Sequence, residues 1–230
     1  MGALSLFKDI LFPARCARCR KIVAEGAICE RCYLEIEPYN FLRCGRCRAR
    51  LPANEKICHP DWPFVLGAAA AYQDESVQAL IKTLKFENIT DAAQALAELI
   101  FQFAGTMPKE IFEGGVIVPV PLHSARLRKR GYNQSELIAR ILAGKMDLPI
   151  EKEFLVRLRP TRPQSELRSH EEREINVADC FRVKNTENVY GRKIILLDDV
   201  ITSGNTLYAA AKALKSAGAK KIIVLTAAMA

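Results

Sequence analysis

Two neighbouring aspartates, Asp198 and Asp199, end an apolar run in the segment IILLDDVITSGNT (194–206). The residues after them are rich in hydroxyl groups and open a predicted helix: Thr202, Ser203, Gly204, Asn205 and Thr206. Backbone N–H groups at a helix start bind phosphate, and glycine lets the phosphate come close. Carboxylates beside such a loop would repel a phosphate but suit hydroxyl groups or a magnesium ion. The pattern therefore predicts a site for a ribose 5-phosphate; the alternative is that these residues only cap a helix.

A second group of chemically active residues is the set of cysteines, seven of which lie between residues 16 and 58. Two Cys-x2-Cys pairs supply the four thiolates of a structural zinc site. The candidate ligands are Cys16, Cys19, Cys29, Cys32, Cys44, Cys47 and Cys58, with His59 next to the last. We predict one or two structural Zn²⁺ ions.

The pairing of these cysteines stays open at this point. Sequential filling makes a first site from the four cysteines of 16–32 and a second from Cys44, Cys47 and Cys58 with His59. Filling across the segment instead joins Cys16 and Cys19 with Cys44 and Cys47.

The elements that must position these residues alternate along the chain. Period-two and continuous apolar runs predict strands at 64–72, 116–120, 153–158, 192–200 and 220–229. Helical spacing of apolar residues predicts helices at 75–86, 91–105, 133–145 and 205–219. Such alternation predicts an α/β fold with a mostly parallel sheet covered on both faces. Ligands of such sheets bind beyond the carboxyl ends of the strands, where Asp198 and Asp199 stand.

Composition and charge narrow the class of protein. The chain has 230 residues, and its net charge is +8, from 34 basic and 26 acidic side chains. Residues 1–66 hold 11 basic and 7 acidic groups and residues 120–173 hold 12 and 7. This excess suggests an anionic partner such as a phosphate compound or nucleic acid, and the equally open alternative is a solvated surface. No apolar run reaches the ~20 residues of a membrane span, and the start lacks a signal-peptide pattern, so we expect a cytoplasmic protein.

A boundary is expected at the segment CHPDWPF (58–64), where two prolines disfavour regular structure. It divides the chain into a cysteine-rich zinc-binding module over 1–63 and an α/β domain over 64–230.

The motif at 194–206 resembles the phosphoribosyl pyrophosphate (PRPP) motif of type I phosphoribosyltransferases. Together with 116–140, 161–181 and the cysteine-rich start, it resembles the ComF family, phosphoribosyltransferase-like proteins linked to bacterial DNA uptake. The resemblance covers nearly the whole chain. It implies a type I phosphoribosyltransferase-like, mostly parallel sheet flanked by helices, with a small N-terminal zinc-binding module.

The resemblance also assigns roles to residues. Asp198 and Asp199 would be the catalytic pair that holds the sugar, with Mg²⁺ accompanying PRPP. The turn Pro121, Leu122, His123 would meet pyrophosphate, and the following basic residues would bind its charges: Arg126, Arg128, Lys129 and Arg130. A family signature matches Gln164, Leu167, Arg173 and Asn176. For His123 a turn-capping role is favoured over a proton shuttle, and the basic cluster could also be a solvated surface.

Two functions follow from the resemblance. One is a PRPP-binding protein that handles single-stranded DNA during DNA uptake, together with DNA-uptake proteins. The other is an enzyme of nucleotide metabolism that transfers phosphoribose to a nucleobase or another small acceptor. No segment of the sequence identifies an acceptor. ComF relatives often carry another Cys-x2-Cys where this chain has Cys58-His59, so the second zinc site could be three-cysteine, histidine-completed or empty.

Overall fold

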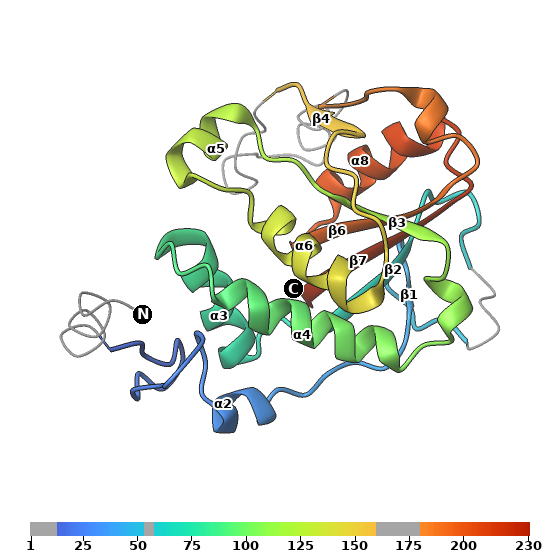
Figure 1. Ribbon diagram of the computed structural model, residues 1–230. Coiled ribbons are helices and arrows are strands. Elements are labelled where there is room, and N and C mark those ends of the chain that lie inside the picture. Colours follow the sequence, from blue (N-terminus) through green and yellow to red (C-terminus); the bar gives the residue numbers. More distant parts are fainter. Residues whose placement is uncertain (1–12, 53–57, 160–179) are drawn as a thin grey trace.

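Five strands form the central sheet of the computed structural model, in the order β1-β2-β7-β6-β3 (Figure 1). The last four run parallel, whereas β1 is antiparallel to β2. A separate two-stranded sheet pairs β4 with β5. The strands are β1 (Arg43–Cys44), β2 (Val65–Ala71), β3 (Gly115–Pro119), β4 (Leu155–Arg157), β5 (Phe181–Val183), β6 (Lys193–Ile201) and β7 (Lys221–Met229). The structure describes residues 13–52, 58–159 and 180–230.

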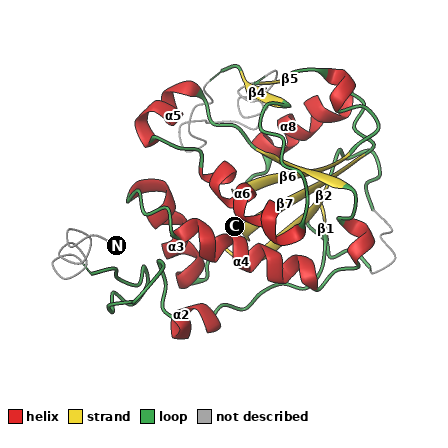
Figure 2. Ribbon diagram, viewed as in Figure 1, coloured by secondary structure: helices red, strands yellow, loops and turns green. Residues whose placement is uncertain are grey.

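Helices cover both faces of this sheet (Figure 2). One face packs against α3, α4 and α6, and the other against α8 and the β4–β5 pair. The helices are α2 (Glu30–Leu34), α3 (Glu75–Phe86), α4 (Ala92–Gly105), α5 (Ser124–Arg130), α6 (Gln134–Met146) and α8 (Asn205–Ser216), with 3-10 turns at Lys109–Ile111 and Thr186–Asn188. The predicted α/β class, with a mostly parallel sheet between helices, is thus confirmed.

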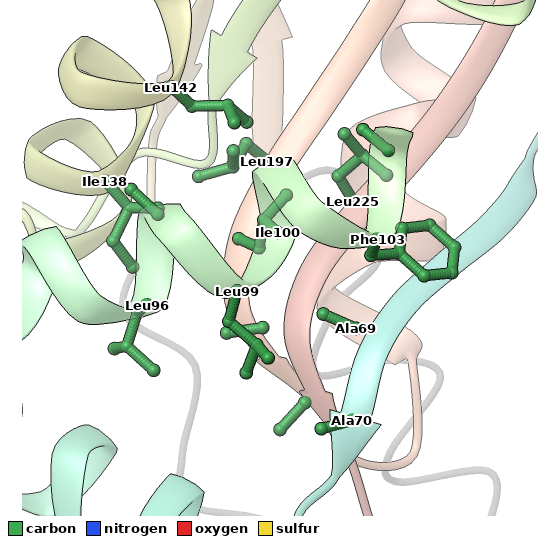
Figure 3. Packing of buried hydrophobic residues seen from close by; sticks show 14 of the residues in the cluster. Ala69, Ala70, Leu96, Leu99, Ile100, Phe103, Ile138, Leu142, Leu197 and Leu225 are labelled. Carbon is green, nitrogen blue, oxygen red and sulfur yellow. The ribbon is translucent and has the colours of Figure 1, made fainter. Parts of the chain in front are cut away.

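The alternation of side chains along β6 explains the two covered faces. Ile195 and Leu197 point into the core under α4 and α6, while Ile194 and Leu196 point into the core under α8. Because β6 is buried on both faces, its sequence is a continuous apolar run rather than an alternating one. Figure 3 shows Leu197 among Ile100 of α4 and Leu142 of α6, all buried.

Polar side chains fix where two helices of this face begin. The Asp74 carboxylate accepts hydrogen bonds from the backbone N–H groups of Ser76 and Val77 at the start of α3. The Asn133 side chain accepts one from Ser135 N (3.1 Å) at the start of α6. Such caps satisfy N–H groups that have no partner inside the helix. Both helices therefore start where the sequence predicts.

The cysteine-rich segment packs on the α/β domain. Its strand β1 extends the central sheet at the β2 edge. Ser76 Oγ donates a hydrogen bond to the carbonyl of Cys32 (2.8 Å), and Arg18 forms ion pairs with Glu75 (3.1 Å) and Glu35. Within the described residues, we find no helix with the length and apolar character needed to cross a membrane.

Candidate functional site

The candidate site lies where two neighbouring parallel strands end. β3 and β6 stay paired as far as Pro119 and Leu197, and Val120 N donates a hydrogen bond to the Leu197 carbonyl (2.9 Å). The segment that leaves β3, which begins with Pro121, is therefore beside Asp198 of β6. The turn and the aspartates, far apart in sequence, thus share one edge of the sheet.

Asp199 is buried and paired with a cation. Its side chain is 3 % exposed, and its Oδ2 lies 2.7 Å from Nζ of Lys85, at the end of α3. A buried carboxylate is unfavourable unless a partner neutralises it. Lys85 supplies that partner and ties α3 to the end of β6.

Asp198 has a different environment. Ser135 Oγ, in the first turn of α6, donates a hydrogen bond of 2.6 Å to Asp198 Oδ1. Burial, and then the charge of Asp199, raise the pKa of Asp198 to about 6, although the Ser135 hydrogen bond and Lys85 act in the opposite direction. A carboxyl group with a raised pKa at the end of a parallel strand is a common feature of functional sites.

Arg157 of β4 belongs to the same electrostatic environment. Burial lowers the pKa of Arg157, the nearby Arg126 of α5 lowers it further, and the charge of Asp198 partly offsets both. The site therefore brings together a carboxylate from β6 and guanidinium groups from α5 and β4. This mixture of charges can hold a ligand that carries both hydroxyl and phosphate groups.

The loop after β6 has the geometry of a helix start. Gly204 precedes α8 and has a φ of 85°, in the left-handed region that favours glycine. Thr202 and Ser203 are exposed, and Asn205 N donates a weak hydrogen bond to Ser203 Oγ (3.4 Å). The first backbone N–H groups of α8, including that of Thr206, form the positive end of a twelve-residue helix. Anion binding at this loop stays a prediction.

The basic segment after β3 forms the short helix α5, in which no residue is buried and which stands out from the sheet (Figure 1). Arg126, Arg128 and Lys129 are exposed, and Arg130 bonds to Gln134. His123 caps α5, its Nδ1 accepting from Ala125 N (3.3 Å), so the capping role is what the geometry supports.

One aromatic side chain next to α5 was not singled out from the sequence. Phe86, the last residue of α3, is 74 % exposed. The Cζ of Arg130 lies 5.9 Å from the centre of its ring. Leu127 of α5 is also exposed, by 42 %. An exposed aromatic ring beside a basic helix is a suitable surface for a nucleobase and its phosphates.

The cysteines gather into two clusters in the sequential arrangement, so filling across the module is wrong. One cluster consists of Cys16, Cys19, Cys29 and Cys32, and the other of Cys44, Cys47, Cys58 and His59. Within each cluster the ligand atoms all lie within 4.8 Å of one another.

Both clusters fit zinc. Tetrahedral zinc with Zn–S bonds of about 2.3 Å requires sulfur atoms about 3.8 Å apart. Cys19 and Cys29 have a Sγ–Sγ distance of 3.8 Å, Cys47 and Cys58 one of 3.4 Å, and His59 Nδ1 lies 3.4 Å from Cys44 Sγ. Zinc here would hold the loops in place, since each cluster offers four protein ligands and no open position.

Sequence reasoning missed three residues that the structure brings to the two aspartates: Lys85, Ser135 and Arg157. None of them carries a local signal, because each reaches the site from another part of the chain. The signature residues lie outside the described residues: Gln164, Leu167, Arg173 and Asn176. All other candidate site residues lie within them.

Comparison with known proteins identifies the family. Residues 87–229 match the phosphoribosyl transferase domain, and residues 7–60 match the double zinc ribbon domain. The first match covers most of the chain, including β3, β6 and the 202–206 loop. The chain therefore belongs to the phosphoribosyl transferase domain family, with an N-terminal double zinc ribbon.

Curated relatives align with this chain over 63–93% of its length. The chain is 28% identical to Competence protein F of Haemophilus influenzae over 93% of this chain and 96% of that protein. It is 28% identical to DNA utilization protein YhgH of Escherichia coli K12 over 91% and 87%. Competence protein ComFC of Bacillus subtilis is also 28% identical, over 63% of this chain and 56% of that protein. These relatives confirm the resemblance to the ComF family.

Proposed function

We propose that this protein binds PRPP with Mg²⁺ and acts in the handling of single-stranded DNA during DNA uptake. The observation that carries the proposal is that β3 and β6 are neighbours, which brings the turn after β3 beside Asp198, while the 202–206 loop follows β6. The match of residues 87–229 to the phosphoribosyl transferase domain supports a phosphoribosyltransferase-like site. The names of its relatives, which refer to competence and DNA utilization, support the biological setting.

Each part of PRPP has a chemical counterpart at this edge. The 5-phosphate suits the N–H groups of the 202–206 loop, at the positive end of α8. The ribose hydroxyl groups suit Asp198, a residue that is less buried than Asp199. The pyrophosphate suits the turn 121–123 and the guanidinium groups of Arg126 and Arg157. In this assignment Asp199 neutralises and positions Lys85.

The chemistry that this arrangement supports is transfer of phosphoribose. The bond between the anomeric carbon and pyrophosphate breaks, and the acceptor forms a new bond to that carbon. Magnesium supplies charge that stabilises the leaving pyrophosphate. The chain's own residues orient the sugar through Asp198 and bind the departing anion through Arg126 and Arg157.

A nucleic acid partner is supported by the surface next to this edge. Phe86 offers an exposed ring, and α5 offers Arg126, Arg128 and Lys129 on a helix with no buried residue. Bases stack on exposed aromatic rings without strong sequence preference, while basic side chains bind the backbone. The surface therefore suits single-stranded DNA. We expect the protein to act in the cytoplasm.

The test combines PRPP, Mg²⁺ and DNA. Pyrophosphate release is measured with the zinc-loaded full chain in the presence of nucleobases, small amines or single-stranded DNA. We expect PRPP to bind in every case, and pyrophosphate release to rise when single-stranded DNA or a DNA-derived acceptor is present. Release with a free nucleobase, and no binding of DNA, would instead favour the enzyme of nucleotide metabolism.

A further inference from the structure

An arginine of the second cysteine cluster reaches the predicted phosphate loop. Arg48 directly follows Cys47, and its guanidinium lies against Gly204, before α8. A Cβ built on Gly204 would clash with Nη2 of Arg48 and lie 3.5 Å from its Cζ. The absence of a side chain at Gly204 therefore allows the Arg48 guanidinium to come close, and it also allows the left-handed turn. The contact joins the zinc ribbon to the loop that follows the aspartates.

Part of this guanidinium lacks a partner. Nη1 of Arg48 is buried and has no hydrogen-bond partner among the described residues. A buried N–H donor without an acceptor is unfavourable, so native proteins rarely keep one without a reason. An anionic ligand at the loop would supply the acceptor. Phosphate is well matched to it, since its oxygens accept two parallel hydrogen bonds from an arginine.

The other cysteine cluster provides an internal comparison. Arg20 follows Cys19 as Arg48 follows Cys47, and both arginines have a φ of 63°. Their N–H groups donate equivalent bonds of 3.0 Å to the carbonyls of Cys16 and Cys44. Glycine is the residue that this backbone favours, yet both positions hold arginine. Across the described ranges, the one interaction found for the Arg20 side chain is an exposed ion pair with Glu87, at 3.9 Å, so the loop contact belongs to the Arg48 side chain.

The second cluster holds Arg48 in place. Cys44 and Cys47 precede it, and Cys58 with His59 closes the cluster from the other side. The segment that follows is docked on α8, where the Trp62 ring lies 4.5 Å from the ring of Tyr208. Zinc at this cluster would therefore hold the backbone of Arg48 in a fixed position relative to Gly204.

We propose that Arg48 binds the 5-phosphate of PRPP at the 202–206 loop, and that the second zinc cluster positions it there. The inference rests on the proposed PRPP site and adds a ligand-binding residue from the zinc ribbon. It makes zinc binding and PRPP binding linked events in one chain. Loss of zinc from the second cluster should then weaken the binding of the PRPP 5-phosphate.

The test uses two matched substitutions, Arg48→Gly and Arg20→Gly. Both place glycine in a backbone conformation that favours it, so each variant should keep two zinc ions and its unfolding midpoint. PRPP binding with Mg²⁺ is measured by calorimetry. We expect Arg48→Gly to weaken PRPP at least about tenfold, Arg20→Gly to leave it unchanged, and Arg48→Lys to keep part of the affinity.

The outcomes separate this inference from the proposed function. If the unsubstituted chain binds PRPP and Arg48→Gly binds it equally well, the role of Arg48 is wrong while the PRPP site stands. An equal loss in Arg20→Gly and Arg48→Gly would also overturn it, because the effect would then come from the zinc ribbon in general. If the unsubstituted chain does not bind PRPP, both proposals fail together.

Discussion

Lys85 Nζ lies 2.7 Å from Oδ2 of Asp199, and this ion pair joins the end of α3 to the end of β6. The neighbouring Asp198 instead accepts a hydrogen bond of 2.6 Å from Ser135 of α6. Two adjacent carboxylates of one motif therefore have separate partners from separate helices. We expect them to have separate roles, with Asp199 structural and Asp198 directed at the ligand.

The first prediction concerns the stability of the Lys85–Asp199 pair. Asp199→Asn leaves Lys85 without its counter-charge, and Lys85→Met leaves a buried carboxylate unpaired. Each variant should lower the free energy of unfolding in urea by about 3 kcal/mol, because breaking a buried pair strands the other charge. The double variant should lose less than the sum of the two. Additive losses would show that the two side chains are not coupled.

The second prediction concerns pH and Asp198. Its pKa of about 6 in the folded protein exceeds the usual value for aspartate, so the folded state holds this proton more tightly than the unfolded state. The free energy of unfolding should therefore lose this contribution as pH rises from about 4 to about 6. Asp198→Asn removes the effect, so the variant should gain stability relative to the unsubstituted chain, by about 3 kcal/mol above pH 6.

The measurement is chemical unfolding of both proteins across that pH range. The difference between them should be smallest near pH 4 and constant above pH 6. A difference that does not change with pH would mean that Asp198 titrates normally. A cost of this kind at neutral pH is typical of a residue kept for function rather than for stability.

The sequence predicts much of the fold because its signals are local. The apolar runs of β6 and β7 and the helical spacing of α3 are each contained in one segment, and each element forms within a few residues of its predicted bounds. Zinc binding by the cysteine-rich segment is also predicted from Cys-x2-Cys spacing alone, although the number of ions, one or two, is not. The pairing of the cysteines is not, because it depends on how the segment folds back on itself.

The rest of the site depends on contacts between distant elements. Lys85 looks like any cation near the end of an amphipathic helix until α3 packs against β6. Ser135 is an ordinary residue of a helix start until α6 brings it to Asp198. Arg48 reads as part of a basic, solvated segment, and only the docking of the second cluster on α8 directs it to Gly204.

The third prediction concerns zinc. Elemental analysis of the purified full chain should find two zinc ions, one for each four-ligand cluster. Cys19→Ser and Cys47→Ser should each lose about one zinc, whereas Cys180→Ala, outside both clusters, should keep two. Zinc replaces a hydrophobic core in so small a module, so chelation should also unfold it. A folded module with no metal would contradict the assignment.

The fourth prediction concerns single-stranded DNA. Phe86→Ala should weaken binding by about 1–3 kcal/mol, the usual worth of one stacked base. Tyr190→Ala is the matched control, because Tyr190 is an equally exposed aromatic residue (77 %) next to Gly218, at the other end of α8. Fluorescence anisotropy with a labelled oligonucleotide measures both. Equal effects of the two substitutions would argue against a stacking surface at Phe86.

The salt dependence of the same binding gives a further check on α5. Three to five phosphate contacts would give a slope of log K against log salt of about −2 to −3.5. Neutralising Arg126 and Arg128 together should reduce the slope by about 1.4 if both contact phosphate. Excess PRPP should compete with DNA if the two share these side chains. A flat salt profile would leave a small-molecule phosphoribosyltransferase as the better interpretation.

Calorimetric titration of the zinc-loaded full chain with PRPP and Mg²⁺ tests the central claim most directly. The account predicts one PRPP per chain, with an affinity that falls at least about tenfold when Asp198 is replaced by alanine and the fold persists. A Gly204→Ala variant, strained at its φ of 85° and crowded by Arg48, should also bind poorly. No binding by the unsubstituted chain, or full affinity in both variants, would contradict the account.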